Sequence, residues 1–132
     1  MENERELLEL AAKAAGIKII RSRLADPLWS DMLIENSNVE NDGNPSARWN
    51  PLTEDGDAFR LAGKLRIDFT WQPAMEEVIA YPTMHDTLEI TEEYKEYSDH
   101  GLPVDTYRYA ALRRAIVRAA AEIGRAMQSD KR

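Results

Sequence analysis

The strongest constraint on the fold is a long amphipathic segment near the C-terminal end, residues 106–128. With successive side chains about 100° apart, as in an α-helix, its apolar residues fall on one face. These residues are Leu112, Ile116, Ala119, Ala120, Ile123 and Met127. We therefore predict one long helix, with Arg114, Arg118 and Arg125 on the opposite, solvated face. Such an arginine row could instead meet a phosphate or an acidic partner.

A second helix is predicted at the start of the chain, over residues 2–15. Its apolar residues share one stripe: Leu7, Leu8, Leu10, Ala11, Ala14 and Ala15. Asn3 is placed to cap the first turn, and Glu6 follows at the spacing of a capping box. Gly16 is placed to take the left-handed conformation that ends a helix.

A third helix is predicted between Thr53 and a point near Arg66. Its apolar residues recur at helical offsets: Ala58, Leu61, Ala62 and Leu65. Thr53 is the candidate N-cap, and Asp55 and Asp57 would lie at the positive end of the helix dipole. Phe59 would flank the apolar stripe.

The clearest strand pattern is residues 67–71, where apolar and polar side chains alternate. A tight connection leads to a second predicted strand within residues 75–81, so a hairpin is expected. We predict a third strand at residues 87–91 and then an irregular acidic stretch, with a short helix as the competing interpretation. Because three helices and this sheet must share a core, the fold class predicted is α+β. The helices would pack on a small, mainly antiparallel sheet, as in an α-β-α sandwich.

The chain has 132 residues, which fits a single domain over residues 1–132. Residues 36–47 are rich in Asn, Ser, Asp, Gly and Pro and predict a flexible surface loop. Residues 129–132 predict a frayed tail. Residues 17–23 could form a strand or a packed linker, and residues 29–35 a strand or an irregular packed segment.

Charge and composition exclude several classes of function. The chain has 24 Asp and Glu residues against 17 Lys and Arg, giving a net charge of −7. Nucleic-acid binding needs surplus cations, so no nucleic-acid partner is expected. The absence of cysteine excludes disulfides, thiolate catalysis and zinc sites built on sulfur. No segment resembles a signal peptide or approaches the ~20 apolar residues that span a bilayer, so we expect a soluble cytoplasmic protein with no membrane partner.

Asp55, Asp57 and His85 are the residues from which a cation site or a catalytic site could be built. Two neighbouring carboxylates can hold Mg²⁺, and His85 beside Asp86 is half of a general-base arrangement. Helix capping explains both earlier aspartates, however, and no nucleophile motif accompanies His85. His100 is predicted in a plain loop. No metal, cofactor or catalytic residue is therefore assigned.

Trp49, followed by Asn50, precedes the third predicted helix and has two interpretations. If buried, Trp49 would pack on that helix and fix its entry angle. If exposed, it would form with Trp29 an aromatic patch suited to a protein partner. The acidic residues 92–97 also have two interpretations, a solvated edge or a mimic of a nucleic-acid backbone, and the first is favoured.

Three stretches together resemble one known family. They are similar to blocks of the phage α-β-α sandwich domain family of small prophage-encoded proteins. The stretches are Trp49–Ala62, which carries most of the weight, Arg113–Gly124 and Leu8–Gly16. Family members tend to have glycine near the position of Arg66, where this chain departs. The resemblance implies a three-layer fold and a phage origin, and supplies no catalytic residues.

These observations favour a prophage-encoded accessory protein in the cytoplasm of a bacterial host. We expect a non-enzymatic domain that binds a host or phage protein, with Trp49, Asn50, Asp55 and Asp57 as candidate binding residues. The alternative is a small metal-assisted enzyme or ligand-binding domain that uses Asp55, Asp57 and His85. The oligomeric state is left open.

Overall fold

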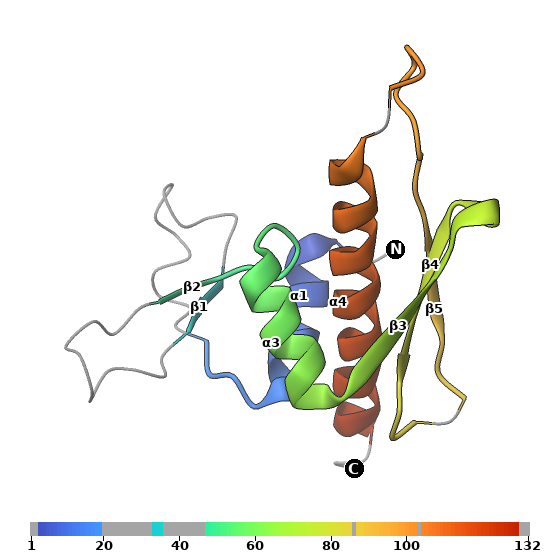
Figure 1. Cartoon of the computed structure of the whole chain (residues 1–132). Helices are drawn as coiled ribbons and strands as arrows, with labels where there is room; N and C mark the ends of the chain where they lie inside the picture. The colour runs from blue at the N-terminus through green and yellow to red at the C-terminus, as the bar shows by residue number, and fades with distance from the viewer. Residues whose placement is uncertain (1–2, 20–32, 36–46, 86, 103, 130–132) are drawn as a thin grey trace. The chain divides into compact units, whose positions relative to one another are not determined.

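The order of helices and strands follows the sequence pattern closely. The computed structural model describes residues 3–19, 33–35, 47–85, 87–102 and 104–129 (Figure 1). The elements are α1 (Glu4–Ala15), β1 (Leu33–Glu35), β2 (Ala47–Trp49), α3 (Asp55–Leu65), β3 (Ile67–Gln72), η2 (Pro73–Met75), β4 (Glu77–Pro82), β5 (Ile90–Glu93) and α4 (Asp105–Ser129). Helices combined with antiparallel sheet confirm the predicted α+β class.

Contacts between residues divide the chain into two compact units. The first comprises residues 1–50 and 120–132, and the second residues 51–119, so helix α4 contributes to both. Among the described residues, no helix combines the length and apolarity needed to cross a membrane.

Helix α1 of the first unit has the ends that its sequence predicts. The Asn3 side-chain oxygen accepts a hydrogen bond from the Glu6 backbone N–H at 2.8 Å, which confirms the cap. The reciprocal half of the capping box differs, because the Glu6 carboxylate faces the Asn3 side-chain amide at 3.5 Å. Gly16 ends the helix with φ +72°, as expected of a glycine C-cap.

The same unit contains a close approach between α1 and the end of α4. A Cβ atom added to Gly124 would lie 2.1 Å from the backbone oxygen of Leu10, a distance that no real Cβ atom tolerates. Small side chains surround this contact, and the buried residues of the two segments are Leu8, Ala11, Ala12, Ala15, Ala120, Ala121 and Ile123. The buried alanines Ala11, Ala12, Ala120 and Ala121 leave room for the two helices to pack this closely.

Strands β1 and β2 form a two-stranded antiparallel sheet in which Leu33 pairs with Trp49. Part of the segment predicted over residues 29–35 is thus a strand. The loop predicted at residues 36–47 falls outside the described residues except for Ala47, which belongs to β2. Residues 20–23, Trp29 and residues 130–132 also lie outside them.

In the second unit, α3 begins later than its sequence suggests. Its N-cap is Glu54, whose side chain makes no capping bond, so the prediction of Thr53 as the cap is wrong. The reason is that the helix starts at Asp55, which leaves Thr53 one residue too early. The predicted end is confirmed at Arg66, which takes the left-handed conformation with φ 55° and ψ 50°.

The second unit also holds a three-stranded antiparallel sheet in the order β3-β4-β5. The predicted hairpin of β3 and β4 is confirmed, with Ile67 opposite Pro82 and the turn of η2 at its end. The third strand was predicted at residues 87–91, whereas β5 begins at Ile90 and ends at Glu93. Its pairing register with β4, in which Glu77 lies opposite Glu93, sets this shift.

The two faces of this sheet differ in burial. One face carries the buried residues Ile67, Val78, Ala80, Pro82 and Ile90. Helix α4 runs alongside the sheet (Figure 1), and its residues Ile116 and Val117 are also buried. The opposite face is exposed at Asp68, Thr70, Thr91 and Glu93.

Candidate functional site

The described part of the second unit contains a half-open groove of about 640 Å³. Three elements line it: α3 with Ala58, Phe59 and Ala62, β3 with Ile67 and Phe69, and α4 with Tyr109, Leu112 and Ile116. Most of this lining is apolar, because alanines of α3 and the apolar residues Leu112 and Ile116 of α4 both contribute to it. This apolar hollow is suited to receive an apolar group from outside the chain.

Three aromatic side chains of the groove are open to solvent. Phe59 is 79% exposed, Tyr109 47% and Phe69 42%. A single exposed apolar side chain is ordinary, whereas a cluster around a concavity marks a binding surface. The sequence pattern predicted that Phe59 lies beside the apolar stripe of its helix. It could not predict that Phe59, Phe69 and Tyr109 line the same groove.

Charged groups flank the groove. Arg113 donates from Nη1 to the Asp55 carboxylate at 2.6 Å and from Nε to the Leu52 carbonyl oxygen at 2.8 Å, so Asp55 is held in an ion pair. Arg66 and Asp68 also line the groove and are exposed. Within the described parts of the chain, neither of these two side chains makes a hydrogen bond or ion pair.

The candidate cation residues are not gathered into one site. Asp57 accepts a hydrogen bond from Arg60 at 2.6 Å and is 8% exposed, whereas Asp55 pairs with Arg113. His85 is exposed in the turn after β4. The described residues contain no group of three His, Cys, Asp or Glu side chains able to hold a metal ion. Asp57 instead lies in the first turn of α3, where a carboxylate stabilises the helix dipole.

Trp49 and Asn50 belong to the first unit and are buried, at 4% and 8% exposure. The backbone of Trp49 pairs with that of Leu33 in the β1-β2 sheet, and the packing of its ring on the third predicted helix stays a prediction. The aromatic patch with Trp29 involves a residue outside those described. A binding role for Trp49, Asn50, Asp55 and Asp57 stays a prediction.

Acidic residues of the stretch 92–97 form hydrogen bonds and ion pairs with other residues of the second unit. Glu92 accepts a hydrogen bond from Arg118 and lies 3.8 Å from Arg114 Nε. Arg114 and Arg118 keep 42% and 41% of their side chains exposed, as expected of a solvated face, but both also face Glu92 of β5. Glu96 accepts a hydrogen bond from Arg108 Nη1 at 2.8 Å.

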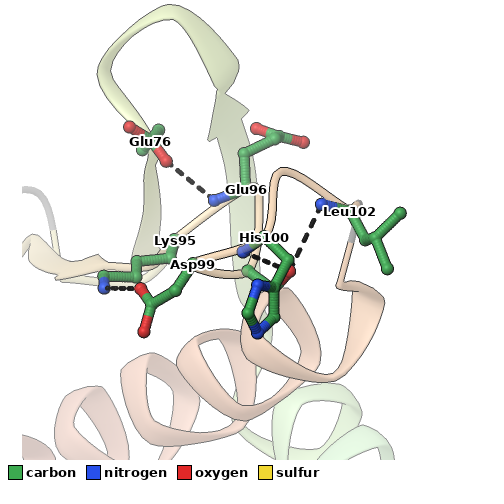
Figure 2. Close-up of polar contacts among 7 residues, drawn as sticks. Glu76, Lys95, Glu96, Asp99, His100 and Leu102 are labelled. Carbon is green, nitrogen blue, oxygen red and sulfur yellow. Dashed lines mark hydrogen bonds and ion pairs between the residues drawn. The ribbon is translucent and has the colours of Figure 1, made fainter.

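A network of polar contacts fixes the loop that follows β5 (Figure 2). The Glu96 backbone N–H donates to the Glu76 carboxylate at 2.7 Å, and Lys95 pairs with Asp99 at 3.3 Å. The Ser98 hydroxyl accepts hydrogen bonds from the backbone N–H groups of His100 and Leu102. His100 therefore belongs to a structured turn, as its loop prediction implies. These contacts explain the acidic residues without an external ligand.

Comparison with protein-family models, with curated proteins and with solved structures gave no match to this chain. The resemblance to the phage sandwich family thus stays a prediction.

Proposed function

We propose that this protein is a non-enzymatic domain that binds another protein, and that it acts as a prophage-encoded accessory factor on a host or phage protein. The observation that supports this proposal is the apolar groove with its exposed Phe59, Phe69 and Tyr109. Aromatic residues beside a concavity dominate the energetics of many protein interfaces. Burying one such ring contributes about 1.5–3 kcal/mol, so three rings can support a specific complex.

The form of the groove favours a segment of a protein chain over a small molecule. Small ligands are usually enclosed, with most of their surface buried. Here Phe59 is 79% exposed at the rim, so much of the binding surface lies outside any enclosed volume. The metal-assisted alternative has less support, because Asp55 and Asp57 each pair with an arginine of their own.

The proposal is tested by capture from bacterial lysate, with and without phage infection, using matched variants. Phe59→Ser removes a groove ring, and Met84→Ser removes a side chain of similar exposure, 68%, that does not line the groove. Because both residues are exposed, neither change should alter folding by more than about 0.5 kcal/mol. We expect a specific companion to be retained by the wild type and Met84→Ser, and its recovery to fall about tenfold with Phe59→Ser.

Two results would overturn the proposal: no companion in either lysate, or a companion that both variants retain equally. Thermal unfolding in Mg²⁺ or Mn²⁺ tests the alternative, since an ion that binds only the native state raises the midpoint. We expect no rise.

A further inference from the structure

Strand β3 has backbone hydrogen-bonding groups that point away from its sheet. In an antiparallel pair, successive residues alternate between bonding to the neighbouring strand and pointing outward. The Thr83 N–H donates to the Arg66 carbonyl oxygen at 2.9 Å, and Pro82, opposite Ile67, has no N–H. The bonded positions are therefore 68, 70 and 72, and the backbone groups of Ile67, Phe69 and Trp71 point outward.

These outward groups lie along an unprotected edge. Strand β3 is the first strand in the order β3-β4-β5, and in the described residues no backbone or side-chain group bonds to its outer edge. The edge of β5 differs, because Arg118 donates to the Thr91 carbonyl oxygen at 3.4 Å. Native sheets usually cover or charge such edges, since an open edge is a template for another strand.

The open edge and the groove adjoin each other. Ile67 and Phe69 contribute outward backbone groups and also line the groove, together with α3 and α4. A chain placed there could bond to the edge of β3 while its side chains enter the apolar hollow. From this juxtaposition, and resting on the proposed function, we infer that the groove accepts an extended segment of the partner protein, which joins the sheet as a strand next to β3.

The lining defines the chemistry of this segment. Alternate side chains should be apolar, because those that face the groove meet Leu112 and Ile116 of α4. A carboxylate should lie near one end, since Arg66 lines the groove, is exposed and makes no ion pair with the described side chains. A basic or hydroxyl residue should lie beside Asp68 for the complementary reason.

A second copy of the chain fits this position less well. Its β3 would arrive with its own α3, since only Arg66 separates the helix from the strand. The edge is also only six residues long, about 20 Å at a strand's rise per residue. A stable dimer usually buries at least about 1,200 Å² in total, more than one short strand edge provides.

The first experiment selects binders from a yeast-displayed library of random nine-residue peptides on the full-length protein. We expect the selected peptides to show apolar residues at every second position. N-methylation of a selected peptide should weaken binding at least tenfold at alternate backbone positions and have little effect at the others, because only one set of amides faces β3. Amide hydrogen exchange by NMR should show new protection of residues 67, 69 and 71 on binding.

The second experiment compares Phe69→Pro with Phe69→Ala. Both variants lose the aromatic ring, but only proline also removes the outward N–H, and it leaves the bonds to β4 intact. We expect the proline variant to bind a selected peptide at least tenfold more weakly than the alanine variant. If Phe69→Pro does not fold, the N-methylated peptides carry the same test on the wild-type protein.

Three results would overturn this inference. Peptides with helical spacing that bind the groove without protecting β3 would exclude strand addition but leave the proposed function standing. Concentration-dependent protection of residues 67, 69 and 71 in the free protein would assign the edge to a second copy. Peptides that bind Phe59→Ser as tightly as the wild type would show that the binding surface is not the groove. That result would contradict both this inference and the observation on which the proposed function depends.

Discussion

Two helical glycines of this protein lie in opposite environments. Gly124 is buried, and its α-carbon faces the Leu10 backbone so closely that an added Cβ would lie 2.1 Å from the carbonyl oxygen. Gly63 is exposed in α3, with no atom within 4 Å of an added Cβ. The same change, glycine to alanine, therefore tests two different physical effects.

We expect Gly124→Ala to lower the free energy of unfolding by about 2 kcal/mol or more, because the methyl group forces α1 and α4 apart. Gly63→Ala should raise it by about 0.5–1 kcal/mol through better helix propensity. Urea unfolding followed by circular dichroism measures both. A Gly124→Ala variant as stable as the wild type would contradict the close packing of these two segments.

We expect ionisation of Tyr94 to make the free energy of unfolding depend on pH in the alkaline range. The side chain is 9% exposed, and its ring packs edge-on against Trp71 at 5.8 Å. Burial raises the pKa of Tyr94, and the neighbouring Glu96 carboxylate raises it further, while Arg108 acts in the opposite direction. The folded state therefore holds the phenol proton more tightly than the unfolded chain does.

Stability from this group is fully present below the unfolded pKa of about 10 and is lost as pH rises through the higher folded value. We expect the free energy of unfolding to fall between about pH 9 and pH 11, and to fall less steeply in Tyr94→Phe. Urea titrations at several pH values provide the measurement. Equal slopes for the two proteins would show that Tyr94 does not govern this decline.

At the scale of elements, ion pairs connect α4 to the strand beside it. Glu92 of β5 is 16% exposed in its side chain and faces Arg118, which is 41% exposed. The pair Lys95–Asp99 is far more open, at 71% and 88%. Water and salt screen exposed pairs strongly, so the two should differ in strength.

Double-mutant cycles to alanine should give a coupling of about 0.5–1 kcal/mol for Glu92 with Arg118, and less than about 0.3 kcal/mol for Lys95 with Asp99. Thermal or urea unfolding at low salt supplies the values. The prediction is contradicted if the exposed pair couples as strongly as the one between β5 and α4.

The elements also show what sequence could predict. Helix α1 was predictable because Asn3 and Gly16 are local signals that need no tertiary partner. The position of β5 was not, since its register depends on pairing with β4. Thr53 is a good cap by residue type, but the start of α3 is one residue further on, where Asp55 meets Arg113 of a distant helix.

The groove could not be predicted for the same reason. Its lining joins α3, β3 and α4, whose residues are up to about sixty positions apart in the chain. Periodicity identified the apolar face of each element, yet not which part of that face would stay uncovered. Phe59 carried a partial signal, since a large apolar residue beside a stripe of alanines lies at the margin of the core.

At the scale of the whole molecule, α4 is one helix whose residues belong to both compact units. Unfolding of either unit would remove the packing that supports part of this helix, and helix formation is cooperative. We therefore expect the two units to unfold together in a single transition, as the single domain predicted from chain length would.

Gly124→Ala tests this cooperativity, since Gly124 belongs to the first unit. Native-state hydrogen exchange by mass spectrometry should show equal losses of stability in peptides from residues 4–15 and residues 67–82. Exchange that changes only in the peptide from residues 4–15 would indicate two independently unfolding units.

The uncovered margin of β3 also bears on how this protein must be produced. A strand edge with unpaired backbone groups is a surface on which aggregation can begin. We therefore expect more precipitation when this chain is produced alone than when a peptide that binds β3 is produced with it.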